Sequence, residues 1–229
     1  MKKQFSIIRF SILLLLALSI GGICFYVHEF RIPKGPKLPP NPPLKTEFSQ
    51  EAVDLNEKAI EIWLLTDDRD PEEGLRLLNQ SIEIEPDYLT AYGNKCTLLM
   101  ELERWAELEE CCNKLIQLQP RDGNPYLTRA YCLYRQGKEK EVKEALMYAL
   151  SAANYQVELG GAEAFNARLM RVPILHSLGK ERLAQAKLDK LEDEFPEYLD
   201  MTVSFRECFN KAIMESDEGG YPWSLFFDE

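Results

Sequence analysis

The sequence has few of the residues on which catalysis and metal binding depend. It contains only two histidines, His28 and His176, and its six cysteines include no C-x-x-C pair. No glycine-rich phosphate loop, H-E-x-x-H motif or G-x-S-x-G motif occurs in it. Metal sites need several ligands at defined spacing. The sequence therefore predicts no catalytic residue, no metal and no cofactor, and the chain is not expected to be an enzyme.

Positive charge is also scarce. Three basic residues (Lys2, Lys3 and Arg9) precede residue 10, and the other 24 of the 27 stand against 38 acidic residues, a net charge of −14. A surface this acidic repels phosphate backbones. Nucleic acid is therefore not an expected partner, and a basic protein or peptide is expected instead.

Residues 10–27 are an 18-residue run without a charged side chain, preceded by the basic leader 1–9. The run approaches the ~20 residues that cross a bilayer and exceeds the ~7–15 of a signal-peptide core. We expect a transmembrane anchor or uncleaved signal, with cleavage after Gly21 and secretion as the alternative. Lipidation at Cys24 is not expected, because Ile23 precedes it where a small residue is needed.

The leader also bears on the side of the membrane. A Met-Lys-Lys start resembles the n-region of an exported bacterial protein, so the rest of the chain is expected to be periplasmic, on the extracytoplasmic face of a bacterial inner membrane. Basic residues flank the apolar run on both sides, which leaves a cytoplasmic-facing domain as an alternative.

Residues 28–48 form a proline-rich linker, since residues 32–44 hold six of the 13 prolines. Prolines at this density favour an extended chain of ~3 Å per residue. We expect a semi-rigid spacer that holds the folded domain roughly 40 Å from the membrane.

Beyond residue 48 a helical pattern repeats with a 34-residue period. The series Leu78, Ser81, Ile82, Ile84 and Pro86 recurs as Cys112, Leu115, Ile116, Leu118 and Pro120. Each proline ends one helix and helps to start the next. This helix–turn–helix unit resembles the tetratricopeptide repeat family, most clearly in the two units that begin at Leu89 and Gly123.

The resemblance implies an all-α fold, a right-handed superhelix of about four repeats over residues 49–198. A capping helix over 199–214 would close the repeats, and an acidic–aromatic tail, 215–229, would follow. Tyr92 and Tyr126 match the family's first aromatic position, Cys96 and Ala130 its small-residue position, and Gly137 its turn. The family geometry also places Cys96 opposite Cys112, the first pair to test for a disulfide. The cysteines are otherwise interpreted as small buried hydrophobic residues.

In this family the first helix of each unit lines a concave groove that receives a peptide or a partner's helix. The corresponding residues here are Asn56, Ile60, Trp63, Thr90, Gly93, Thr97, Glu101, Asn124, Leu127, Tyr131 and Arg135. For Trp63 and Tyr131, packing between repeats is an equal alternative. The carboxylate clamp of chaperone-binding relatives is not expected, because Asn124 and Thr128 stand where Lys and Arg are required.

The expected function is a non-catalytic protein-binding scaffold or adaptor, tethered to a membrane. Two alternatives stay open. One is a dedicated inhibitor or immunity-type protein that blocks one enzyme, and the other is a membrane-tethered assembly chaperone.

Overall fold

The computed structural model describes residues 31–65 and 68–214. Within these ranges all regular structure is helical, which confirms the predicted all-α fold class. The predicted leader 1–9, the membrane segment 10–27 and the tail 215–229 lie outside the described residues. None of the helices in the described ranges combines the length and the apolar character that a membrane crossing needs.

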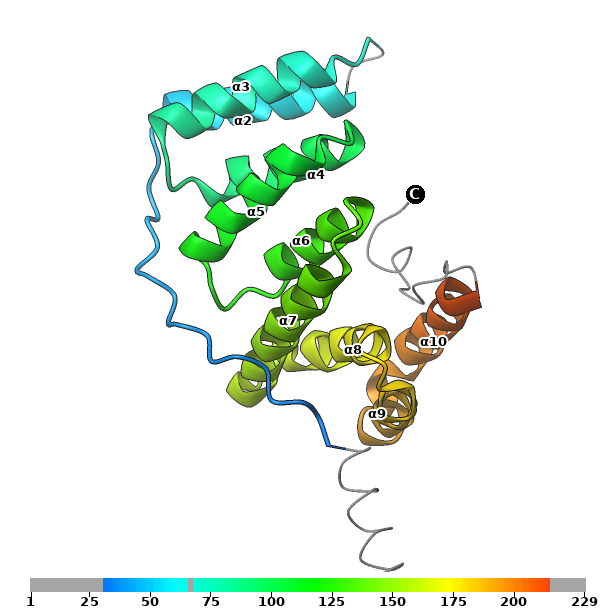
Figure 1. Cartoon of the computed structure of the whole chain (residues 1–229). Coiled ribbons are helices and arrows are strands. Elements are labelled where there is room, and N and C mark those ends of the chain that lie inside the picture. The colour runs from blue at the N-terminus through cyan, green and yellow to red at the C-terminus, as the bar shows by residue number, and fades with distance from the viewer. Residues whose placement is uncertain (1–30, 66–67, 215–229) are drawn as a thin grey trace, which may run out of the picture.

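Successive helices pack against one another in pairs that follow an arc (Figure 1). The pairs are α2 (Gln50–Ile60) with α3 (Pro71–Ile84), α4 (Leu89–Glu101) with α5 (Trp105–Leu118), α6 (Asn124–Arg135) with α7 (Glu139–Leu159), and α8 (Ala162–Ser177) with α9 (Glu181–Glu194). A π-helical turn, Glu61–Leu65, extends α2. A 3-10 turn, Pro196–Tyr198, leads into α10 (Leu199–Met214), which packs against the end of α9.

The turn inside three of these pairs has the same hydrogen bonds. The donating amides are those of Leu102, Glu103 and Arg104 after α4, Gln136, Gly137 and Lys138 after α6, and Leu178, Gly179 and Lys180 after α8. The middle residue has a φ of 54° at Glu103, 70° at Gly137 and 73° at Gly179. Because this left-handed conformation is easy only for glycine, the turn explains the glycine at two of the three positions.

The turn that joins one pair to the next also recurs. The amide of Glu85 donates to the carbonyl oxygen of Ser81, and the amide of Tyr88 donates to that of Glu85. The equivalent donors are Gln119 and Asp122 in the second such turn, and Phe195 and Tyr198 in the third. Pro86, Pro120 and Pro196 occupy the same place in the three turns. The sequence period therefore corresponds to a repeated backbone geometry at both ends of the helices.

The buried side chains form two clusters along the arc. One lies mainly among α2–α5, where it includes Leu78, Leu99 and Cys112, and reaches Cys132 of α6; the other lies among α6–α10 and includes Leu146 and Phe209. Each cluster spans more than one helix pair, so neighbouring pairs depend on each other for burial.

The proline-rich segment lies against the domain. Residues 31–49, called the strap below, run in an extended conformation alongside the helices (Figure 1). Leu38 is only 8% exposed and belongs to the α6–α10 cluster. Gly35 lies so close to α7 that a Cβ atom there would come within 2.5 Å of the Met147 carbonyl oxygen. This close approach requires glycine at residue 35.

Polar contacts fix the rest of the strap. The backbone amide of Arg121 donates to Asn41 Oδ1 and its Nε donates to the carbonyl oxygen of Pro39, each at 3.0 Å. Closer to α2, Glu85 pairs with Lys45 and accepts a hydrogen bond of 2.9 Å from the Ser49 amide. The expected free spacer of roughly 40 Å is therefore wrong for residues 31–48, because burial of Leu38 and these polar contacts hold them on the domain.

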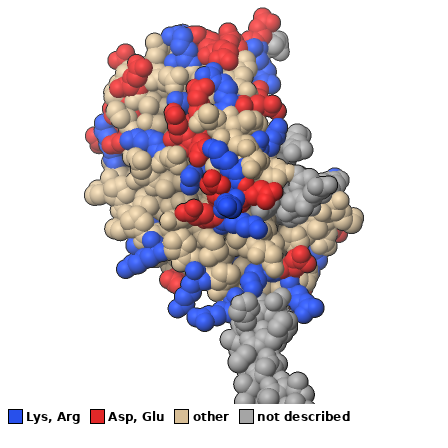
Figure 2. Space-filling view, in the orientation of Figure 1, with Lys and Arg blue, Asp and Glu red and all other residues tan. Residues whose placement is uncertain are grey.

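Charge is distributed unevenly along the arc. Residues 49–118 contain 17 acidic and 6 basic residues, whereas residues 119–214 contain 14 of each. The strap adds four basic residues (Arg31, Lys34, Lys37 and Lys45) against one acid, Glu47. Figure 2 shows the consequence on one face, where red acidic side chains gather toward the α2–α3 end and blue basic ones toward the opposite end.

Candidate binding groove

The predicted groove residues differ widely in exposure. Four are buried (Asn56, Trp63, Leu127 and Tyr131), two are half-buried (Ile60 and Gly93), and five are exposed (Thr90, Thr97, Glu101, Asn124 and Arg135). Only the exposed residues can offer a large part of their surface to a partner, and the half-buried ones can offer a smaller part. The buried ones contribute chiefly to packing.

Two of the buried residues connect α2 and its π-helical turn to α4. Asn94 Nδ2 donates to Asn56 Oδ1 at 2.8 Å. Trp63 is 3% exposed, and its Nε1 donates to one carboxylate oxygen of Glu101 at 2.6 Å. Arg69 pairs with the other oxygen of Glu101, also at 2.6 Å. The charge of Glu101 is thus already balanced within the chain.

A second network surrounds the end of α6. Tyr131 is 4% exposed and meets the ring of Trp105 edge-on, with centroids 5.8 Å apart. Arg135 donates to the Tyr131 hydroxyl at 2.8 Å, lies over the Trp105 ring at 4.6 Å, and pairs with Glu103 at 3.3 Å. These contacts join the end of α6 to the turn that follows α4. The burial of Trp63 and Tyr131 fits the packing role that was the alternative for both.

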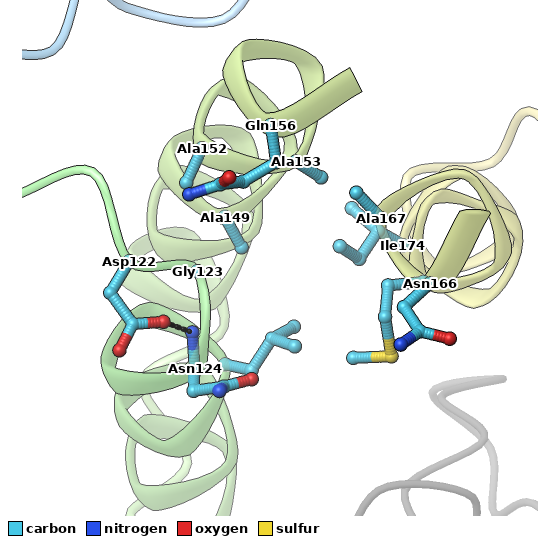
Figure 3. A pocket seen from close by; sticks show the side chains of 12 residues that line it. Asp122, Gly123, Asn124, Ala149, Ala152, Ala153, Gln156, Asn166, Ala167 and Ile174 are labelled. Carbon is cyan, nitrogen blue, oxygen red and sulfur yellow. Dashed lines mark hydrogen bonds between the residues drawn. The ribbon is translucent and has the colours of Figure 1, made fainter. Parts of the chain in front are cut away.

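A cavity of about 170 Å³ opens between α6, α7 and α8, beside the exposed Asn124 (Figure 3). Its apolar lining consists of small and flexible side chains: Leu127, Ala149, Ala152, Ala153, Ala167, Met170 and Ile174. Its polar lining comes from Asp122 and Asn124 on one side, Gln156 of α7, and Asn166 of α8. An apolar floor with a few polar groups at the rim is the usual composition of a binding pocket.

Asp122 is the acidic residue of this cavity. Its Oδ1 accepts a hydrogen bond of 3.0 Å from the Asn124 amide, drawn as a dashed line in Figure 3, and so satisfies a free N–H group at the start of α6. Burial raises the pKa of the Asp122 carboxyl, and the bond from Asn124 opposes that rise only in part. Among the described residues no basic group pairs with it. A cation brought by a ligand would stabilise this carboxylate.

Sequence reasoning found two residues of this cavity, Asn124 and Leu127, and missed most of the others. Asp122 could have been recognised, because an Asp side chain commonly accepts a hydrogen bond from the backbone amide two residues on. Asn166 had no comparable signal. It reaches the cavity only because α8 packs against α7, and no local pattern encodes that contact.

Three buried cysteine thiols, those of Cys96, Cys111 and Cys112, interact with one another. Cys96 Sγ lies 2.6 Å from Cys111 Sγ, and the thiol of Cys112, which the repeat geometry had placed opposite Cys96, also interacts with it. Cys111 is turned toward α4, where its Sγ also donates to the carbonyl oxygen of Tyr92 at 3.3 Å. The five described cysteines are free, and all except Cys208 are buried. In the described ranges no three Cys, His, Asp or Glu side chains gather as a metal would require.

Comparison with protein-family models gives no match for this sequence, and comparison with curated proteins gives no significant match.

Proposed function

We propose that this chain is a non-catalytic, membrane-tethered adaptor of the tetratricopeptide type, a right-handed superhelix whose groove holds a basic segment of a partner protein. The repeated turns at Glu103, Gly137 and Gly179 support the repeat assignment. The binding role rests on one observation above all. Asp122, whose carboxylate has no basic partner among the described residues, lines a cavity next to the exposed Asn124.

The composition of the cavity fits a lysine or arginine of the partner. The aliphatic part of such a side chain would lie on Ala149, Ala152 and Met170, and its charged end would reach Asp122. The amides of Gln156 and Asn166 would bind polar groups of the partner's backbone. A basic segment would also be attracted by the excess of acidic residues in 49–118.

We also propose that residues 10–27 anchor the chain, with the repeats on the extracytoplasmic side. Three residues separate Val27 from Arg31, and the strap begins at the end of the arc where α9 lies (Figure 1). The α8–α10 end would then lie at the membrane surface and the acidic α2–α3 end away from it. A reporter enzyme fused after Lys45, active only outside the cytoplasm, tests this topology; activity in the cytoplasm alone contradicts it.

The groove is tested by photo-cross-linking of the full-length chain in native membranes. A photoreactive residue at the exposed Thr97 should capture a partner, and one at Glu83, an exposed residue of α3, should not. Asp122→Asn keeps the acceptor for the Asn124 amide but removes the charge, and should weaken capture about tenfold or more. Glu83→Gln is its control. Equal capture from both positions, or undiminished capture by Asp122→Asn, would contradict the proposal.

The same experiment separates the two alternative functions. A single partner held in stoichiometric amount would favour a dedicated inhibitor. Several weakly held partners would favour an assembly chaperone.

A further inference from the structure

A second cavity, of about 250 Å³, lies where α7, α8 and α9 meet. Four basic side chains line it, Arg168 and Arg171 of α8 and Lys187 and Lys190 of α9. Glu194 is the acidic residue in the lining. In a chain with a net charge of −11, this is an unusual concentration of positive charge.

Most of this charge is not balanced within the described part of the chain. Lys190 pairs with Glu194 at 3.0 Å, a contact between neighbours on one helix. Arg168 lies over the ring of Phe195 at 4.8 Å, and Arg171 donates to Asn154 Oδ1 at 3.3 Å. Among the described side chains, no carboxylate forms an ion pair with Arg168, Arg171 or Lys187.

Arg171 is the most constrained of the four. Its Nε is buried and has no acceptor in the described structure. Burial and the nearby Arg168 lower the pKa of Arg171. Burial together with Arg171 and Lys190 lowers the pKa of Lys187, and Glu194 opposes this only in part. Like charges held close together and an unsatisfied N–H group both lower the stability of the folded protein at this site. An anion with several acceptor oxygens would offset the repulsion between the basic side chains and would also accept a hydrogen bond from Arg171 Nε.

We propose that this cavity binds a phosphate group. Two guanidinium groups offer paired N–H donors that match the oxygens of a phosphate, and two lysines add point charges around it. The phosphate could be a free ion or part of an anionic phospholipid. The second source is relevant because the strap begins at the same end of the molecule as α9 (Figure 1). This inference does not depend on the groove, since the two cavities share no lining residue.

Thermal unfolding of the full-length chain in a non-ionic detergent tests the proposal. Inorganic phosphate, a short-chain phosphatidylglycerol and a phosphatidylcholine with the same chains are compared, each against sodium chloride of equal ionic strength. At about a hundredfold excess over Kd, phosphate should raise Tm by about 5 °C or more. A rise with both phosphate and phosphatidylglycerol supports a general phosphate site, and a rise with phosphatidylglycerol alone supports a lipid site. An equal response to phosphatidylcholine or to sodium chloride overturns the proposal, as does no response at all.

A charge variant separates a ligand site from a structural cluster. Lys187→Gln should raise Tm without ligand, because it relieves repulsion, and should remove most of the response to phosphate. Lys143→Gln, on the exposed side of α7, should leave the response unchanged. Arg168→Gln provides a second test of the response. Full phosphate stabilisation in both the Lys187→Gln and Arg168→Gln proteins would overturn the assignment.

Discussion

Gly93 and Gly137 differ in backbone conformation but have equally open surroundings. A Cβ atom at either position would meet no other atom within 4 Å. Gly93 lies inside α4, whereas Gly137 has a φ of 70°. We expect Gly93→Ala to raise the free energy of unfolding by up to ~1 kcal/mol and Gly137→Ala to lower it by about 1–2 kcal/mol. Urea unfolding of both variants measures the difference, and a change of the same sign in both would show that φ is not the deciding factor.

The cysteines should differ strongly in reactivity. The thiols of Cys111 and Cys112, together with burial, hold the pKa of Cys96 far above its ordinary range, and burial raises the pKa of Cys132 to about 11. Cys208 is exposed. Because the thiolate is the reacting form, Cys208 should be alkylated at least about a hundredfold faster than Cys96 or Cys132 in the folded, reduced protein.

Iodoacetamide labelling followed by mass spectrometry of peptides measures each rate separately. In urea the rates should become similar, which serves as the control. Native labelling of Cys132 as fast as that of Cys208 would contradict the buried arrangement.

At the scale of elements, the capping helix α10 packs against a histidine of α8. The ring of His176 meets that of Phe209 edge-on at 5.6 Å, and Phe209 is buried in the α6–α10 cluster. Burial lowers the pKa of His176, and the nearby Glu181 opposes this only in part. The folded state therefore prefers the neutral imidazole. Its stabilising effect is complete above the unfolded pKa of about 6.5 and is lost as pH falls below that value.

We therefore expect acidification to loosen α10 first. Hydrogen exchange of the α10 amides at about pH 7.5 and about pH 5.5 should show faster exchange at the lower pH, after correction for the intrinsic rates. His176→Gln should remove this excess. A variant with the same pH dependence as the natural chain would assign the effect to other groups.

The helices themselves were the most predictable elements, and the reason is local. Pro86, Pro120 and Gly137 mark ends and turns through their own backbone limits, so a single sequence reveals them. Which face of the last helix packs was harder to predict: α10 turns Phe209 and Ala212 inward and leaves the apolar Val203 exposed. That rotation depends on contacts with other helices.

The strap was less predictable. Its prolines correctly indicate an extended chain, but composition carries no information about where an extended chain lies. Its position depends on contacts between residues far apart in sequence, such as Asn41 with Arg121 and Ser49 with Glu85. The same holds for the Asp122 cavity, whose walls come from three helices.

At the scale of the whole molecule, charge and the strap suggest one orientation. The start of the strap, with Arg31, Lys34 and Lys37, and the Arg168–Lys190 cavity would face an anionic membrane, while the acidic α2–α5 half would extend away from it. A partner attracted by that half should bind more weakly as salt rises, because exposed charges are screened within about 8–10 Å at physiological ionic strength. In this orientation the half of the molecule that attracts the basic partner would also be the half that extends away from the membrane.

The strap also connects the two core clusters. Leu38 belongs to the α6–α10 cluster, whereas Phe48 packs on the α2–α5 cluster and meets the ring of Tyr88 at 4.6 Å. Stacked repeats contact only their neighbours, so an element that spans both halves should make their unfolding more cooperative. Leu38→Asp should cost about 3 kcal/mol by placing a charge in the core, and should release the strap from α7.

Leu44→Asp is the matched control, since Leu44 belongs to the same strap but is 47% exposed. Calorimetry of the natural chain and of Leu44→Asp should give one transition. In Leu38→Asp it should split in two, with the α6–α10 half unfolding first, because that half loses both the Leu38 side chain and the covering strap. Hydrogen exchange resolved by helix assigns each transition to its half. A single transition in Leu38→Asp, merely shifted to lower temperature, would mean that direct packing between α5 and α6 already couples the two halves, and that the strap contributes stability to one of them only.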